Sequence, residues 1–189
     1  MPLTVETALP FGSMAASDQP CLEADGLVLR PWRADDVPVV RAAFDCPDIQ
    51  RWHVRRMDTD EEARLWIDRW QRRWTAELEA SWAIVSGPVV GQIGLREVQL
   101  FDGFAALSYW VLPEHRGSGV AARAVNALTR WAFDTLGLHR LSLVHSTRNS
   151  SSCRIAQKSG FALEGTQRAA MRLADGWHDQ HTHARLRTD

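Results

Sequence analysis

The stretch RGSGVA at residues 116–121 governs how the rest of this sequence is interpreted. It lies between an apolar run that ends near Leu112 and a helical pattern over residues 120–136. Glycines allow a sharp turn that presents successive backbone N–H groups, and a helix N-terminus adds partial positive charge. The stretch therefore predicts a cradle for a phosphate group. It lacks the ending of a Walker loop and the third glycine of a dinucleotide fingerprint, and alone it is as often only a tight turn.

The sequence on both sides alternates between strand-like and helix-like patterns. Three strand-like runs separated by short turns lie between residues 81 and 112, which indicates an antiparallel meander. The remaining strand-like runs begin at Leu27, His139, Phe161 and His178, and the helical patterns cover residues 34–45, 59–80, 120–136 and 150–159. The resulting order, βααβββαβαββ, predicts an α/β (α+β) fold in one domain.

Composition narrows the class of protein. The chain has 189 residues, 45% of them apolar, and a net charge of -1, which fits one or two globular domains and argues against a disordered chain or a basic nucleic-acid module. Its 3 cysteines form no CxxC pair, so neither a disulfide framework nor a zinc site is predicted. No apolar run is long enough to span a bilayer and no signal peptide is evident, so we expect a cytoplasmic protein without membrane contact.

The first 26 residues differ from the rest because they show neither helical nor strand periodicity. We expect residues 1–26 to be a mobile tail and residues 27–189 to form the domain. Met14 stays open as an alternative start.

The helical pattern after Thr59 carries two local signals. Thr59 followed by Glu62 predicts a capping box at its N-terminus. Trp66, Trp70 and Trp74 repeat every four residues, which favours an aromatic face buried in the core over a ligand-stacking surface.

A second motif follows the cradle and combines spaced polar and glycine residues, namely Asn149, Ser152, Gly160, Phe161, Glu164, Gly165 and Arg168. Together with Arg116-x-x-Gly119-x-Ala121, this run resembles the GNAT superfamily of acyl-CoA-dependent N-acyltransferases, and within it the RimJ/RimL-like (ribosomal-protein N-acetyltransferase-like) group. The order of elements from Leu27 onward agrees. The resemblance implies a mixed, mostly antiparallel central sheet with helices on both faces and with two strands splayed at the CoA site.

The resemblance also implies a function. The chain would move an acyl group, most simply acetyl, directly from acetyl-CoA to a primary amine of a protein N-terminus or a small molecule, without a metal. A backbone N–H near Val111 would stabilise the oxyanion, which is worth about 3 kcal/mol of barrier in acyl transfer. The implied cofactor-binding residues are Trp110, Val111, Leu112, Arg116, Gly117, Ser118, Gly119, Val120, Ala121, Asn149 and Ser152.

The acid that protonates the leaving thiolate is commonly a tyrosine on the helix after the fifth strand of such proteins. The only tyrosine here is Tyr109, on the meander, so it is excluded and the resemblance assigns that role to Ser152. Asn149 would fix the pantetheine or acyl end of the donor. Both residues also suit a helix N-terminus, so a purely capping role stays open.

The resemblance does not identify the general base, because the positions that match the family's acidic residues, in residues 169–172 and at Ala106, carry no carboxylate. Glu97, His145 and His53 remain as candidates, and a water chain is the alternative. We expect the acceptor side to include Trp52, His53, Glu97 and His145.

Two further clusters have competing interpretations. In an extended strand, His181 and His183 share a face that His178 does not, so we predict solvated or substrate-facing side chains and no metal. Arg51, Arg55 and Arg56 next to Trp52 lie where the family binds its acceptor, which favours an acidic substrate. Nucleic-acid binding by the arginine-rich helix is disfavoured because acidic residues alternate with its arginines.

Substrate identity stays open between a protein N-terminus, a small amine and an amino-sugar antibiotic, and a longer acyl group is not excluded. The alternative to an enzyme is a CoA-binding or sensing module without turnover. The oligomeric state stays open, with a homodimer as one alternative.

Overall fold

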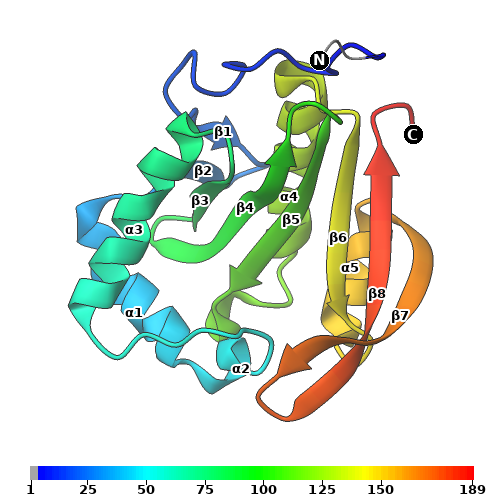
Figure 1. Cartoon of the computed structure of the whole chain (residues 1–189). Helices are drawn as coiled ribbons and strands as arrows, with labels where there is room; N and C mark the ends of the chain where they lie inside the picture. Colours follow the sequence, from blue (N-terminus) through cyan, green and yellow to red (C-terminus); the bar gives the residue numbers. More distant parts are fainter. Residues whose placement is uncertain (1–3) are drawn as a thin grey trace.

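A sheet of eight strands forms the centre of the computed structural model, which describes residues 4–189. The strand order is β1-β2-β3-β4-β5-β6-β8-β7, and β5 and β6 form its parallel pair (Figure 1). The strands are β1 (Leu22–Glu23), β2 (Val28–Pro31), β3 (Ala80–Val85), β4 (Val89–Gln99), β5 (Phe104–Val111), β6 (Arg140–Ser146), β7 (Ala162–Leu173) and β8 (Gly176–Leu186).

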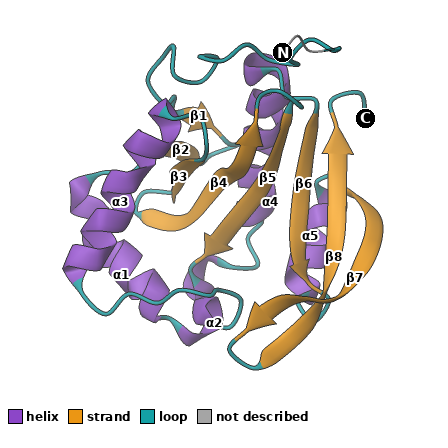
Figure 2. Ribbon diagram, viewed as in Figure 1, coloured by secondary structure: helices purple, strands orange, loops and turns teal. Residues whose placement is uncertain are grey.

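Helices cover both faces of this sheet (Figure 2). They are α1 (Val37–Asp45), α2 (Pro47–Gln50), α3 (Asp60–Thr75), α4 (Val120–Arg130) and α5 (Ser150–Lys158), with short helical turns at 34–36, 113–115 and 131–136. The first three lie on one side, and α4 and α5 lie behind the sheet in Figure 1. The predicted order and the mixed, mostly antiparallel sheet are confirmed, with a two-residue β1 and a one-turn α2 added. Within residues 4–189, no helix has the length and apolar character needed to cross a membrane.

Helix α3 begins and packs as its sequence predicts. Thr59 Oγ1 accepts the Glu62 N–H at 3.2 Å, and the Glu62 carboxylate accepts the Thr59 N–H at 3.0 Å. Trp66, Trp70 and Trp74 are all buried, and the ring centroids of Trp66 and Trp70 lie 5.1 Å apart in an edge-to-face arrangement. The predicted capping box and buried aromatic face are both confirmed.

Strands β5 and β6 separate along their length. Their pairing runs from Phe104–Arg140 to Leu107–Leu143 and then stops, while both strands continue. Figure 1 shows the two strands diverging below this point. The predicted splay is therefore present, and it leaves one edge of β5 without a strand partner over residues 108–111.

The segment before β1 packs against the domain, which differs from the mobile tail expected over residues 1–26. Leu9 and Met14 are buried, and the Glu77 carboxylate accepts N–H groups of Gly12 and Met14, each at 2.6 Å. The Trp74 indole N–H donates to the carbonyl of Ser17. These partners are distant in the sequence, so the segment itself shows no periodicity that would reveal them. Residues 1–3 of that prediction lie outside the described residues.

Candidate functional site

A cavity of about 380 Å³ opens where β5 and β6 separate. Its walls come from α2 and the loop after it, β5, the loop before α4, the first turn of α4, and α5. The predicted cofactor residues that line it are Trp110, Val111, Arg116, Gly117, Gly119, Val120, Ala121, Asn149 and Ser152. Leu112 and Ser118 do not line it. Leu112 is buried in an apolar cluster with Ile49, and the Ser118 hydroxyl donates to the carbonyl of His115.

The turn before α4 has the backbone conformation that its glycines allow. Gly117 and Gly119 have φ angles of 82° and 80°, which is the left-handed region that disfavours other residues. Gly119 is also the N-cap residue of α4, so the free N–H groups of the first helical turn face the cavity rim. Arg116 Nε donates to the carbonyl of Val111 at 3.0 Å and thereby ties this turn to β5.

The free edge of β5 presents the Val111 N–H group into the gap. The Leu112 N–H donates to the Val90 carbonyl of the neighbouring β4 segment at 3.0 Å. Because successive N–H groups of an extended chain point in opposite directions, the Val111 N–H points toward the diverging β6. This is the donor that the resemblance assigns to the oxyanion.

Tyr109 and Ser152 meet across the gap. Tyr109 Oη and Ser152 Oγ lie 2.7 Å apart, and either hydroxyl can donate. Burial raises the pKa of Tyr109 to about 12, so its phenol is protonated at neutral pH. Tyr109 therefore reaches α5 although it lies on a strand of the meander, because β5 and β6 separate at this point.

Asn149 acts as a helix cap in this structure. Its side-chain oxygen accepts the Ser152 N–H at 3.1 Å, at the start of α5. Asn149 also lines the cavity, so the contact is compatible with both interpretations left open by the sequence.

A second cavity, of about 240 Å³, lies beside the first. The two share His53, Tyr109 and Trp110 as a common wall. The second cavity is otherwise bounded by residues of α1, α3, β4, β5, the loop between α2 and α3, and the loop between α3 and β3. Groups bound in the two cavities would therefore contact the same three residues.

Positive charge dominates the second cavity. Arg55, Arg69 and Arg96 line it, with Glu79 as the carboxylate among its lining residues. Glu79 already accepts hydrogen bonds from Arg69 at 2.9 Å and from Arg73 at 2.8 Å.

Backbone carbonyl groups, rather than a carboxylate, accept the hydrogen bonds of the Arg96 guanidinium. The guanidinium donates to the carbonyls of Ala80 and Leu95 and lies 4.4 Å from the ring centroid of Trp70. Burial lowers its pKa to about 10, which leaves it charged at neutral pH. Among the described residues Arg96 forms no ion pair.

His53 is the candidate base that reaches both cavities. Its ring packs edge-to-face on Phe44 at 4.9 Å, and its Nδ1 accepts the Arg55 N–H at 3.2 Å. Burial, and then the charge of Arg55, lower the pKa of His53 below its usual value. The imidazole is therefore neutral at pH 7, and its proton-accepting lone pair is on Nδ1, which faces the Arg55 N–H.

The other two candidates for the base lie elsewhere. Glu97 is exposed in an irregular part of β4, with a φ of 52°, and lines neither cavity. His145 is buried beside His181 and His183 and also lines neither cavity. Trp52, expected on the acceptor side, lines the first cavity.

The members of the predicted histidine cluster do not all lie together in the structure. His178 contacts Ser146 and Asp175, apart from His181 and His183. His178 and His183 are buried, so the expectation of solvated side chains is wrong for both.

Of the predicted arginine patch, only Arg55 lines the second cavity. Arg51 stacks on Trp52, and Arg56 pairs with Asp58.

Comparison with known proteins gives a consistent result. The family model described as the acetyltransferase (GNAT) domain matches residues 26–162. The chain is 28% identical over 156 residues to the uncharacterized N-acetyltransferase YoaA of Bacillus subtilis, which covers 80% of this chain and 88% of that protein.

Two solved structures illustrate the similarity of the fold. Ribosomal-protein-S5-alanine acetyltransferase from Vibrio fischeri matches with a TM-score of 0.82 at 19% identity, over 90% of this chain and 98% of that one. The microcin C7 self-immunity acetyltransferase MccE, solved with acetyl-CoA and AMP, matches with a TM-score of 0.81 at 17% identity, over 86% and 93%.

Proposed function

Because this chain belongs to the GNAT family of acetyltransferases, we propose that it transfers an acetyl group from acetyl-CoA to a primary amine of an acceptor that also carries an acidic group. The observation that carries this proposal is the pair of cavities that share His53, Tyr109 and Trp110 as a wall. The cavity with the glycine turn takes the donor, and the arginine-lined cavity takes the acceptor. Attack then occurs at the shared wall.

The first cavity fits the donor chemically. Its turn offers free backbone N–H groups of the kind that bind a pyrophosphate, and Lys158 of α5 lines the same cavity. The unpaired edge of β5 at residues 108–111 offers hydrogen-bonding groups to the amide-bearing pantetheine arm. When bound, acetyl-CoA supplies a thioester whose carbonyl carbon accepts the amine.

Three groups of the chain then act on the reacting atoms. The Val111 N–H stabilises negative charge on the carbonyl oxygen. Ser152 Oγ donates a hydrogen bond to the departing thiolate sulfur, and Tyr109 Oη donates to Ser152 in turn. His53 Nδ1 accepts the proton that the amine loses when the new C–N bond forms, after its hydrogen bond from the Arg55 N–H has opened, because Nε2 of the neutral ring already carries a proton.

The second cavity supports the acidic character of the acceptor. A charged guanidinium without a carboxylate partner is costly in a confined site, and an incoming anion relieves that cost. Arg96 provides such a position, and the exposed Arg55 adds positive charge at the rim, whereas Glu79 is already neutralised by Arg69 and Arg73. One matched structure is named a ribosomal-protein acetyltransferase, which supports a protein as the acceptor. We therefore propose a protein N-terminus followed by an acidic residue.

Acceptor-dependent thiol release tests the activity. The purified chain is mixed with acetyl-CoA and short peptides with a free α-amine, and free thiol and acetylated peptide are measured together. We expect equal amounts of the two products. Tight CoA binding without either product would contradict the enzyme proposal and favour the CoA-sensing alternative.

Replacing Arg96 by methionine tests the acceptor. We expect KM for a peptide with glutamate at its second position to rise about 10-fold, because a charge-assisted hydrogen bond contributes roughly 1.5–3 kcal/mol. The matched glutamine peptide should change little. Arg130→Met, at an exposed position of α4 that lines neither cavity, is the control variant. Equal losses for both peptides in Arg96→Met would indicate general disruption and contradict the acceptor proposal.

Action in the cytoplasm, a homodimeric state, and the absence of nucleic-acid or membrane partners remain predictions from the sequence.

A further inference from the structure

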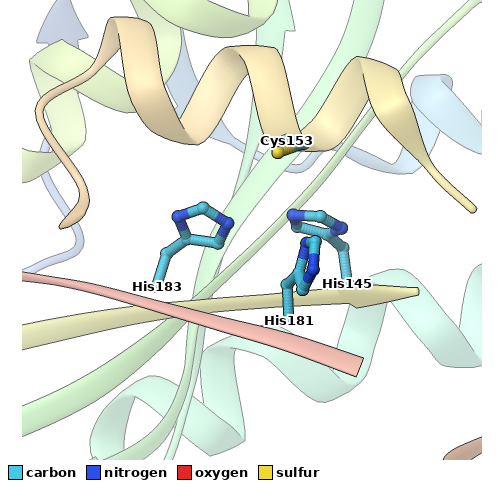
Figure 3. Close-up of side chains that lie close together, drawn as sticks. All are labelled: His145, Cys153, His181 and His183. Carbon is cyan, nitrogen blue, oxygen red and sulfur yellow. The ribbon is translucent and has the colours of Figure 1, made fainter. Parts of the chain in front are cut away.

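Four potential metal ligands converge behind the donor cavity. His145 comes from β6, His181 and His183 from β8, and Cys153 from α5 (Figure 3). In the sheet His145 pairs directly with His181, and α5 places Cys153 over the three rings. One ligand atom from each of the four lies within 4.8 Å of all the others. None of the four lines either cavity of the proposed active site.

The imidazole rings of His145 and His183 each make a hydrogen bond that leaves the lone pair of the other ring nitrogen without a partner. His145 Nδ1 lies 2.8 Å from the carbonyl oxygen of Ser146, and His183 Nδ1 lies 3.2 Å from that of Phe161. A carbonyl only accepts, so each Nδ1 carries a proton and each Nε2 carries a lone pair. Both Nε2 atoms are buried without a partner, and so is Nδ1 of His181. Three unsatisfied imidazole nitrogens in one place require an explanation.

We propose that His145, Cys153, His181 and His183 bind a zinc ion. Three imidazoles and one thiolate are a ligand set that zinc takes in closed, tetrahedral sites. Donation of Nδ1–H to a backbone carbonyl is the usual support for an imidazole that binds a metal through Nε2. Neighbouring ligand atoms of tetrahedral zinc lie about 3.3–3.6 Å apart, so rotations of the side chains close the observed cluster.

The position of this site suggests a structural role. Cys153 follows Ser152 on α5, and its zinc bond would fasten the first turns of that helix to β6 and β8. The ion would thereby hold one wall of the donor cavity without touching the reacting atoms. The four ligands leave no coordination position for substrate, which is typical of a structural zinc site.

The sequence alone did not suggest this set. It grouped His178 with His181 and His183, and the extended geometry correctly separates His178 from the other two. The missing ligands come from β6 and α5, and only the strand pairing brings them to the same face.

Cobalt titration tests the proposal independently of activity. The reduced full-length chain is stripped of metal with a chelator and titrated with Co²⁺, which reports a thiolate ligand by a charge-transfer absorption band. We expect the band to saturate at one ion per chain and to disappear when zinc is added. Cys153→Ala should abolish the band and lower zinc affinity at least about 100-fold. Cys46→Ala, which removes another partly buried thiol, should leave both unchanged.

A second measurement separates metal loss from misfolding. Zinc should raise the Tm of the unmodified chain and of Cys46→Ala but not that of Cys153→Ala, while circular dichroism of the three metal-free proteins stays the same. His181→Ala should retain the cobalt–thiolate contact with weaker affinity, because one nitrogen ligand is lost. Absence of the band from the unmodified chain, or its survival in Cys153→Ala, would overturn the proposal.

Discussion

Replacing Ser152 by alanine is expected to lower kcat for acetyl transfer about 100-fold, because groups that assist proton transfer contribute roughly 10²–10⁴-fold. The substitution removes the hydroxyl that we propose donates to the departing sulfur but keeps the backbone N–H that Asn149 caps. The helix should therefore begin at the same residue. CoA affinity, measured by calorimetry, should change little.

Tyr109→Phe extends this prediction to the partner hydroxyl. Because Tyr109 Oη and Ser152 Oγ form one hydrogen-bonded pair, each single variant breaks the same relay. The double variant should be no slower than the slower single variant, as expected for residues that act as a unit. Losses that multiply would show that the two hydroxyls act separately.

Ser151→Ala is the matched control for Ser152→Ala. Ser151 also lines the donor cavity, yet it is exposed and does not contact Tyr109. Its replacement should leave kcat near that of the unmodified enzyme. An equal loss in both serine variants would contradict a specific role for Ser152.

The pH dependence provides a second readout for the pair. The pKa of Tyr109 is raised to about 12, so its hydroxyl remains protonated and the rate should not fall through pH 9. The pKa of His53 is lowered, so its basic form is present above a midpoint below the usual value of about 6.5. The rate should therefore fall on the acid side of that midpoint. Ser152→Ala should lower the whole profile without moving this acid limb.

Local signals were sufficient for much of the fold. The capping box of Thr59 and Glu62 and the turn around Gly119 depend on residues within a few positions of one another, so their patterns are visible in the sequence. The splay of β5 and β6 was expected only because of the family resemblance. No local pattern indicates where two strands stop pairing.

Features that depend on distant contacts were missed. The Tyr109 hydroxyl reaches Ser152 only because β6 has diverged from β5. Arg96 lies in the second cavity next to Trp70 of α3, and only the fold brings these two residues together. Glu97, adjacent to it, had the right chemistry for a base, but an irregular register turns it to solvent. Residue type alone cannot show whether a side chain lies in a cavity, as Arg96 does, or faces solvent, as Glu97 does.

Gly94, in the interior of β4, leaves room for the guanidinium of Arg96 and for the close approach of β3. Replacing Gly94 should therefore be strongly destabilising. A Cβ added to Gly94 would lie 2.2 Å from the carbonyl oxygen of Ala80 and 2.9 Å from Nη1 of Arg96. The first neighbour is backbone of the paired strand β3, so it cannot rotate away as a side chain would. Gly94→Ala must therefore push β3 and β4 apart or displace the guanidinium.

We expect Gly94→Ala to cost about 3 kcal/mol of the free energy of unfolding, at the upper end for overpacking, and to lower Tm by roughly 6–12 °C. The same carbonyl of Ala80 accepts a hydrogen bond from Arg96, so KM for the acidic peptide should rise as well. Gly165→Ala is the control, because a Cβ there meets nothing within 4 Å and β7 is exposed at that point. Thermal unfolding of both variants decides the matter. Equal Tm values would mean that the close approach of β3 and β4 at Gly94 does not limit the stability of the fold.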